Sequence, residues 1–360
     1  MKDNPYLMFL QFCLDDSLPL PASSSKIEWK EMLAWAERQA IVGIIYGGIT
    51  DVRCKRDDGK SKLKIPFDDL MEWIGYAQTI ENQNRILNKK CANVASEYES
   101  AGFRCVILKG QGNAMMYPAY IKRTPGDIDV WIVNALRKDV KQYVESNKVV
   151  LGYHYEHIEY DENNIPIELH FVPGIMNNPI YNRRLQQWYN KKADEGFKMA
   201  ELPDGVGEIP VPTVEFNIVF QLAHMMHHFF DEGIGLRQMI DYYYLLKSNG
   251  RSRMKEMSDT LKYLNLFNFA GAVMYIIKEV LGLDEKYLIV PVDERRGKTL
   301  LKEILKGGNF GKYSGLTQHS IGTKFFLKIW RNLHFIREYP AEALSEPFFR
   351  TWHFFWRLAH

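Results

Sequence analysis

Apolar residues recur at three- and four-residue steps along much of the first hundred positions. The spacing runs over residues 29–44 and again from Phe67 to about Glu99, with a polar stretch at 51–64 between them. Because this spacing places apolar side chains on one face of a helix, it predicts amphipathic helices. We expect residues 1–95 to form an N-terminal helical lobe.

The pattern changes between residues 96 and 180, where short apolar runs replace the helical spacing. A short continuous apolar run, or alternation of apolar with polar residues, is typical of a strand. A polar, turn-rich link at 161–164 separates two such segments and predicts a β-hairpin. The predicted elements are strands at 105–108 and 128–133, a helix at 136–148, and hairpin arms at 153–160 and 165–172.

The rest of the chain divides into two parts. Residues 181–212 continue a stretch rich in Pro, Gly and Asn, and we interpret them as a crossing segment. From Thr213 the helical spacing returns, and residues 213–360 are expected to form a C-terminal helical lobe. The order of elements predicts an α+β, mainly helical fold, in which a small mixed β-sheet core at 96–180 is flanked by N-terminal and C-terminal helical lobes.

Composition narrows the class of protein only slightly. Hydrophobic residues make up 46% of the 360 positions and charged residues 25%, as in ordinary folded proteins. A net charge of +2 gives no general attraction to polyanions, so nucleic-acid binding is not favoured and would need a local basic patch. The four cysteines stand singly, which indicates neither a disulfide framework nor a zinc finger.

The sequence shows neither a membrane-spanning segment nor a secretory signal. No window approaches the roughly 18 uninterrupted apolar residues of a membrane span, and the N-terminus does not have the form of a secretory signal. We therefore expect no membrane partner and a cytoplasmic location. The sequence leaves the oligomeric state open.

Two acidic residues interrupt the second predicted strand. Asp127 and Asp129 are two positions apart, so their side chains emerge on one face, while Ile128 and Val130 point to the other. Two ionised carboxylates at this separation repel each other unless a cation lies between them. Mg²⁺ (or Mn²⁺) suits them, because such ions take oxygen ligands and keep positions open for substrate phosphates.

The last predicted strand offers a third carboxylate. Glu168 and His170 share one face of this strand, and apolar residues fill the other. If this strand lies beside the strand of Asp129, Glu168 joins the two aspartates, and three carboxylates could hold two metal ions. Glu168 could also accept the proton of a nucleophile. We interpret His170 as a hydrogen-bonding or packing neighbour.

A phosphate-binding segment is predicted just after the first strand. Gly110 follows this strand and opens a predicted helix, a place where backbone N–H groups favour anions. Lys109 and Arg123 can add cationic contacts to a triphosphate. The candidate nucleotide-binding residues are Lys109, Gly110, Gln111 and Arg123.

These motifs together resemble a known family. The carrying residues are Leu108-Lys109-Gly110, Tyr117-Pro118, Arg123-Thr124-Pro125-Gly126-Asp127-Ile128-Asp129 and Ile167-Glu168-Leu169-His170. In this order they resemble the uncharacterised bacterial nucleotidyltransferase family of the polymerase-β-like superfold. The resemblance extends to residues 29–44, 224–246 and 307–311. It departs from the wider superfamily at Gln111 and Gly126, where that superfamily often has Ser.

The resemblance implies Mg²⁺-dependent transfer of a nucleotidyl group, with Asp127 and Asp129 as metal ligands and Glu168 as the third carboxylate. The substrate would be a nucleoside triphosphate. The acceptor, a small molecule or a macromolecule, cannot be read from the sequence.

The helical region after Thr213 supplies candidates for the acceptor site. His224, His227 and His228 have a spacing that could bind Zn²⁺, but we favour a cleft-lining role for His228. Arg237 and Asp241 are four positions apart, and we favour a salt bridge between them over direct contact with the acceptor.

Two further functions remain open at this point. The first is a catalytically degenerate module that binds a nucleotide without transferring it. The second is a metal-dependent glycosyltransferase, in which an Asp-x-Asp motif also holds a divalent ion. We rank it lower, because such folds build several strand–helix units before that motif and here about a hundred largely helical residues precede it.

Overall fold

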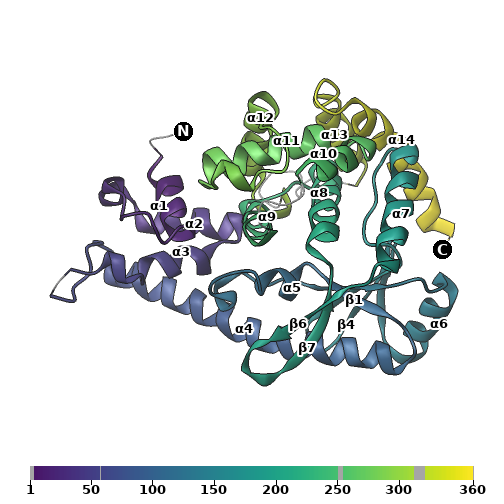
Figure 1. Ribbon diagram of the computed structural model, residues 1–360, viewed down its shortest axis with the longest axis horizontal. Helices are drawn as coiled ribbons and strands as arrows, with labels where there is room; N and C mark the ends of the chain where they lie inside the picture. Colours follow the sequence, from purple (N-terminus) through teal and green to yellow (C-terminus); the bar gives the residue numbers. More distant parts are fainter. Residues whose placement is uncertain (1–3, 57, 250–253, 312–320, 360) are drawn as a thin grey trace.

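A computed structural model describes residues 4–56, 58–249, 254–311 and 321–359. Its first part consists of short helices that lead into one long helix (Figure 1). The elements are α1 (Pro5–Leu14), η1 (Ala22–Lys26), α2 (Trp29–Gln39), α3 (Val42–Ile49), η2 (Val52–Cys54) and α4 (Phe67–Ser100). The helical spacing of 29–44 predicted one helix, but the chain forms two. The break falls at Ala40, whose φ of 55° is left-handed and ends α2.

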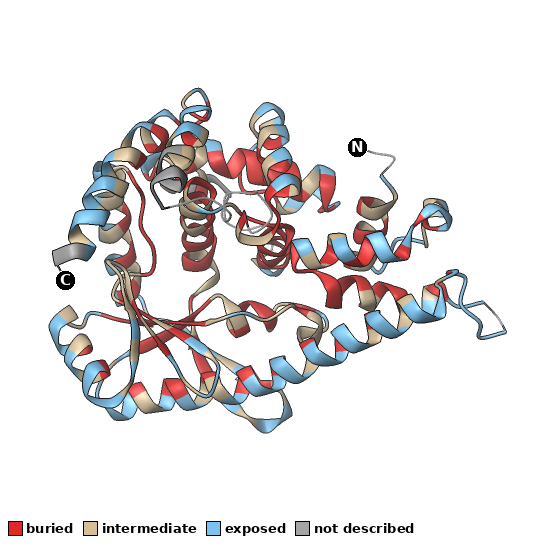
Figure 2. Ribbon diagram, turned by 180° about the vertical axis from the view of Figure 1, so that it is seen from behind, coloured by how far each residue is buried: buried red, intermediate tan, exposed pale blue. Residues whose placement is uncertain are grey.

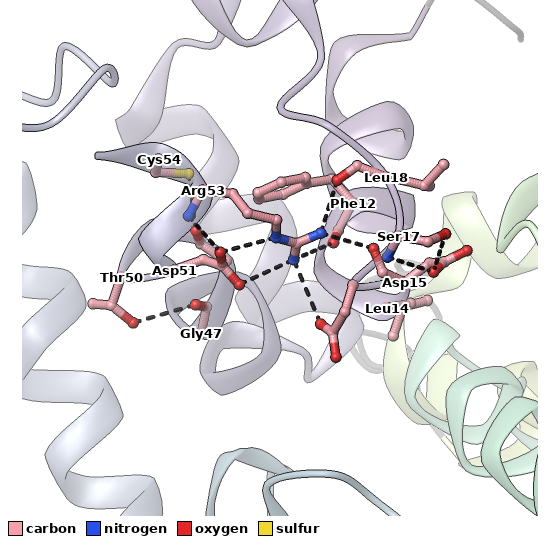
Figure 3. Close-up of polar contacts among 12 residues, drawn as sticks. Phe12, Leu14, Asp15, Ser17, Leu18, Gly47, Thr50, Asp51, Arg53 and Cys54 are labelled. Carbon is pink, nitrogen blue, oxygen red and sulfur yellow. Dashed lines mark hydrogen bonds and ion pairs between the residues drawn. The ribbon is translucent and has the colours of Figure 1, made fainter. Parts of the chain in front are cut away.

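Arg53 fixes the connection between α3 and α4 to the end of α1 (Figure 3). Its guanidinium donates hydrogen bonds to the backbone oxygens of Phe12, Asp15 and Leu18, at 3.1, 2.9 and 2.8 Å. It also pairs with the carboxylate of Asp51 at 2.9 Å. These carbonyls lie at and just beyond the end of α1, where a helix leaves acceptors without intrahelical partners. Arg53 therefore satisfies them and holds the N-terminal helices together.

A five-stranded mixed sheet follows α4. The strands are β1 (Cys105–Leu108), β2 (Ile128–Ile132), β3 (Val150–Tyr153), β4 (His157–Asp161) and β5 (Pro166–His170), in the spatial order β1-β2-β5-β4-β3. Only the β2–β5 pair is parallel, and its register places Asp129 beside Glu168. The predicted hairpin arm 153–160 is divided, because β3 ends at Tyr153 and β4 begins at His157.

The two faces of the sheet have different characters. Ile107, Val130 and Leu169 point from one face into an apolar core that includes residues of α4. The helix α6 (Arg137–Asn147) adds Val140 and Val144 to this core. Because side chains alternate along a strand, Asp129 and Glu168 lie on the opposite face. Helices of the C-terminal part lie on this side of the sheet (Figure 1). The predicted boundary at residue 95 falls inside α4, which packs on this sheet with its second half.

Residues 181–212 contain more regular structure than the interpretation as a crossing segment suggested. They include most of α7 (Pro179–Asp194), followed by the hairpin of β6 (Lys198–Leu202) and β7 (Gly207–Val211), with η4 (Pro203–Gly205) at its turn. Asn178 caps α7 and Pro179 begins it, which are ordinary start signals of a helix. The hairpin was missed because the apolar and polar residues of its strands alternate poorly.

The C-terminal helices lie on the side of the sheet that carries Asp129 and Glu168 (Figure 1). They are α8 (Val214–Asp231), α9 (Leu236–Asn249), α10 (Met254–Tyr263), α11 (Phe267–Tyr275), α12 (Glu294–Gly307), α13 (Ile321–Leu333) and α14 (Pro340–Ala359), with η5 (Ile276–Val280), η6 (Glu285–Tyr287) and η7 (Asn309–Gly311) among them. The helices α8 and α9 are buried along most of their length (Figure 2). The α+β, mainly helical fold with a small mixed sheet is thus confirmed. Within the described ranges, we find no helix with the length and apolar character that crossing a membrane requires.

Candidate functional site

Three carboxylates meet where β2 and β5 run side by side. Asp127 directly precedes β2, Asp129 lies within it, and Glu168 is the neighbour of Asp129 on β5. One carboxylate oxygen from each residue lies within 4.8 Å of the others. We call Asp127, Asp129 and Glu168 the carboxylate cluster. The parallel register of two adjacent strands is what brings together residues about forty positions apart.

Two cationic side chains contact the centre of the carboxylate cluster. Lys109 Nζ lies 2.9 Å from Asp129 Oδ1, and it also donates to Nε2 of His224 at 3.0 Å. His170 Nε2 lies 3.0 Å from the same Asp129 oxygen and 3.4 Å from Glu168 Oε2. Asp129 is therefore the best compensated of the three acids.

The pKa values of the three carboxyls reflect this uneven compensation. Burial raises the pKa of Asp129, but Lys109 and His170 outweigh it and hold the pKa well below its usual range. Burial also raises the pKa of Glu168, and hydrogen bonding to His170 brings it below the usual value. By contrast, the charge of Asp129, followed by burial, raises the pKa of Asp127. A cation beside Asp127 would relieve this repulsion.

A cavity opens beside Asp127 and Asp129, between the sheet and the helices α8 and α9. The residues that line it from the sheet side include Lys109, Gly110, Arg123, Gly126, Asp127 and Asp129, and those from the C-terminal helices include Gln221, His224, Arg237 and Asp241. The segment around η7 adds Phe310. Cationic, acidic and amide groups therefore surround one space next to the carboxylate cluster.

Asp241 is held by a dense set of hydrogen bonds at one side of the cavity. Arg123 Nε donates to its Oδ1 at 2.7 Å and Nη2 to its Oδ2 at 2.8 Å. Tyr117 donates its hydroxyl to Oδ1 at 2.6 Å, and the Asn113 amide lies 3.4 Å from Oδ2. We call Asn113, Tyr117, Arg123 and Asp241 the Asp241 network.

This network corrects the predicted pair of Arg237 and Asp241. The carboxylate of Asp241 is paired with Arg123, while Arg237 Nη1 donates to the backbone oxygens of Pro125 at 3.2 Å and Thr124 at 3.4 Å. The spacing along α9 favoured a local partner, but a distant arginine fits the carboxylate with two parallel bonds. Asp241 therefore holds the guanidinium of Arg123 in place.

Two arginine nitrogens at the cavity are buried without a hydrogen-bond partner. They are Nη1 of Arg123 and Nε of Arg237. Both side chains line the cavity, and both residues are less than a tenth exposed. A Cβ atom at Gly126 would lie only 3.3 Å from Arg237 Nη1, so glycine at this position leaves room for the guanidinium of Arg237.

Two candidate residues lie elsewhere. The Gln111 side chain turns toward α4, where its amide donates to the side chain of Asn88 and to the backbone oxygen of Asn84, so it is directed away from a nucleotide in the cavity. His228 is not among the cavity-lining residues, and its ring packs 4.3 Å from that of His224. His224 takes the lining position instead, one helical turn earlier on α8.

Sequence reasoning missed His224 and Phe310 as cavity residues. For His224 a signal existed, because it shares a helix face with His228 and only the direction of α8 decides which of them reaches the cavity. Phe310 had none, since its position depends on how the segment 309–311 folds back beside Arg237, whose guanidinium lies 5.5 Å from the Phe310 ring.

The fold is α+β and mainly helical, and its small mixed sheet carries the carboxylate cluster. The chain belongs to the uncharacterised nucleotidyltransferase family, whose model matches residues 25–282. No curated protein matches the sequence. Among solved structures, an antigenic nucleotidyltransferase-like protein from Paracoccidioides brasiliensis is similar at 12% identity and a TM-score of 0.34, over 53% of this chain and 92% of that one.

Family membership supports nucleotidyl transfer as the general function of the chain. It gives no support to the glycosyltransferase alternative.

Proposed function

We propose that the protein is a Mg²⁺-dependent nucleotidyltransferase that moves a nucleoside monophosphate from a triphosphate to a hydroxyl acceptor. One observation carries the proposal: three carboxylates within 4.8 Å of one another, two of which border a cavity lined by Lys109, Arg123 and Arg237. Membership of a nucleotidyltransferase family supports the same class of reaction.

The donor atoms of the carboxylate cluster fit Mg²⁺ or Mn²⁺. All three residues offer carboxylate oxygens, which are the ligands that these hard ions prefer. We propose Asp127, Asp129 and Glu168 as the metal ligands. When bound, the ion would neutralise negative charge on the phosphate oxygens during transfer.

The remaining roles follow from charge and position. Gly110 and the unpartnered Nη1 of Arg123 are proposed to contact phosphate oxygens, and Lys109 is proposed to move from Asp129 to a phosphate when nucleotide binds. Arg237 is proposed to hold the nucleotide or the acceptor from the α9 side. We assign Asp241 to positioning Arg123, and we no longer propose a contact role for Gln111 or His228.

The reaction would proceed by in-line displacement. The acceptor oxygen forms a bond to the α-phosphorus, the bond from that phosphorus to the β-phosphate oxygen breaks, and pyrophosphate leaves. Glu168, whose pKa lies below its usual value, is ionised at neutral pH and is proposed to accept the acceptor's proton.

The experiment measures transfer directly. The full chain is incubated with Mg²⁺ and each of four α-labelled nucleoside triphosphates, with polyhydroxylated small molecules, total tRNA or the protein itself as acceptors. Pyrophosphate release and label transfer are expected for the wild type and for Asp139→Asn, which changes an exposed acid on α6. Asp127→Asn should lose both. Equal transfer by Asp127→Asn and the wild type would refute the metal role.

A second candidate function is nucleotide binding without transfer. The observation that favours it is that two side chains of the protein itself, Lys109 and His170, already compensate the charge of Asp129. Calorimetry with ATP and Mg²⁺ separates the two functions: binding without pyrophosphate release from any acceptor would support this candidate.

A further inference from the structure

A second group of possible metal ligands lies next to the carboxylate cluster. The antiparallel register of β4 and β5 places His157 directly opposite His170, and Glu168 lies two positions before His170 on the same face. One ligand atom from each of these three residues lies within 4.8 Å of the other two. We call His157, Glu168 and His170 the histidine cluster.

The contacts within the histidine cluster centre on the carboxylate of Glu168. His170 Nε2 lies 3.4 Å from Glu168 Oε2, and His157 Nε2 lies 4.0 Å from Glu168 Oε1. The two imidazole rings are 5.1 Å apart between centroids. Small side-chain rotations would bring one atom of each residue to the spacing that a shared ion requires.

An independent observation also points to a ligand. The Nδ1 atoms of His157 and His170 are both buried and have no hydrogen-bond partner, and His170 is only 6% exposed. Buried polar atoms are normally satisfied, so two unpartnered ring nitrogens in adjacent histidines need an explanation. His170 is cationic beside Asp129 and Glu168, so an ion would bind it by displacing its proton, and no protein contact at Nδ1 holds either ring against turning toward that ion.

The donor set of this cluster differs from that of the carboxylate cluster. Two imidazoles and one carboxylate suit Zn²⁺ and similar transition ions, whereas Mg²⁺ prefers oxygen ligands alone. We propose that His157, Glu168 and His170 bind one transition-metal ion of the Zn²⁺ class, beside the proposed Mg²⁺ site and sharing Glu168 with it. This proposal does not require that the protein transfers nucleotides.

A bound ion would have a structural consequence for the neighbouring site. His170 also contacts Asp129, and Glu168 belongs to both clusters. An ion in the histidine cluster would therefore fix the side chains that position Asp129 and Glu168.

The experiment is a Zn²⁺ titration of the full chain by calorimetry, in buffer with excess Mg²⁺ so that all-oxygen sites are occupied. We expect one Zn²⁺ per chain. His157→Gln should weaken binding at least about tenfold, the lower end of what even an outer-shell change costs a metal site. His334→Gln, which changes an exposed histidine just after α13, and Asp127→Asn should bind Zn²⁺ as the wild type does. Circular dichroism checks that each variant is folded.

Wild-type affinity in a folded His157→Gln variant would overturn the proposal, as would loss of Zn²⁺ binding in Asp127→Asn, because the ion would then sit in the carboxylate cluster. If His157→Gln does not fold, the visible spectrum of Co²⁺ bound to the wild type tests the proposal instead. Strong visible absorption that excess Mg²⁺ leaves unchanged indicates imidazole ligands at low coordination number, and the weak spectrum of an all-oxygen site overturns the proposal.

The outcome is independent of the proposed function. Zn²⁺ binding without pyrophosphate release would leave the histidine cluster standing and refute only the transferase. Pyrophosphate release without Zn²⁺ binding would support the transferase and refute the Zn²⁺ site in the histidine cluster.

Discussion

The carboxylate cluster and the Asp241 network both bury acidic groups beside one cavity, but they balance charge in opposite ways. Asp241 has an arginine partner that makes two parallel bonds to it, and a tyrosine that donates a third. Asp127 has another acid, Asp129, as the neighbour with the largest effect on its pKa. Residues of both regions line the same cavity.

The difference appears in the direction of the pKa shifts. Burial raises the pKa of Asp241, but the charge and hydrogen bonds of Arg123 outweigh it and keep the pKa below its usual value. The pKa of Asp127 is raised instead, first by Asp129 and then by burial. A carboxylate with a cationic partner stabilises the folded chain. A carboxylate whose main neighbour is another acid becomes more stable when a cation binds beside it. Compensation therefore separates a structural acid from a candidate ligand-binding one.

The largest expected effect tests this separation at Asp127. Asp127→Asn should lower turnover by roughly four orders of magnitude, because phosphoryl transfer depends on charge neutralisation at this point. The same change should raise the melting temperature. A folded-state pKa above the unfolded value means that the ionised form opposes folding at neutral pH, and asparagine removes that charge. Initial rates of pyrophosphate release and thermal unfolding measure the two effects.

Asp139→Asn is the matched control, because it removes an exposed acid that touches neither region. Its turnover and melting temperature should stay close to those of the wild type. A lower melting temperature in Asp127→Asn would contradict the comparison even if activity were lost.

The second effect is on stability, at Asp241. Asp241→Asn leaves the guanidinium of Arg123 buried without its counter-charge, and breaking such a pair costs about 3–5 kcal/mol. Urea unfolding measures the loss of unfolding free energy. The double variant Arg123→Gln/Asp241→Asn removes both charges and should be less destabilised than Asp241→Asn alone. The single variant Arg123→Gln completes a double-mutant cycle. If the losses of the two single variants add up to the loss of the double variant, the pair is not coupled.

The sequence predicted the carboxylate cluster far better than the Asp241 network. The alternation in residues 128–133 and 165–171 already fixes which side chains share a face, and one parallel strand pairing then brings Asp129 beside Glu168. Arg123 and Asp241 are 118 positions apart, and nothing in the local spacing indicates that they pair. The spacing along α9 indicated Arg237 as the partner, and the tertiary contact overrode it.

The same reasoning explains the successes and errors in the fold. Strands at 105–108 and 128–132 were predictable because continuous or alternating apolar residues specify buried strands. The β6–β7 hairpin was not, since Lys198 and Met199 are both exposed and weaken the alternation. His157 was assigned to a strand, but only the register of β4 on β5 shows that it faces His170.

Glu342 offers an intermediate case between the two regions and gives the third prediction. It is a buried carboxylate on α14 that accepts hydrogen bonds from the backbone N–H groups of Asn177 at 2.7 Å and Asn178 at 3.3 Å. Burial and these two N–H groups, rather than a cationic side chain, set its pKa. Burial raises its pKa from 4.5 to about 7, and the two N–H groups lower it only in part. Dipoles alone therefore compensate it less well than Arg123 compensates Asp241.

This shift makes stability depend on pH in a defined direction. Because the folded pKa lies above the unfolded one, the contribution of Glu342 is complete below pH 4.5 and is lost as pH rises through about 7. Relative to Glu342→Gln, which does not titrate, the wild type should lose roughly 3 kcal/mol of unfolding free energy over that range. Urea unfolding from about pH 5 to pH 8 measures it. Glu145→Gln, at an exposed acid, should keep the wild-type slope, and an equal slope in Glu342→Gln would contradict the prediction.

The smallest expected effect concerns Arg237, which lies between the two regions. Gly126→Ala places a Cβ atom 3.3 Å from Arg237 Nη1, so the guanidinium must shift by a few tenths of an ångström. Its flexible end can move, so we expect unfolding free energy to change by less than about 1 kcal/mol. If Arg237 holds the triphosphate, the Kd for ATP with Mg²⁺ should rise severalfold in calorimetry.

Gly75→Ala on α4, where a Cβ atom meets nothing within 4 Å, is the control and should bind ATP as the wild type does. Unchanged affinity in Gly126→Ala would mean that only residues on the sheet side of the cavity bind the nucleotide. Arg237 would then bind the acceptor or stabilise the fold.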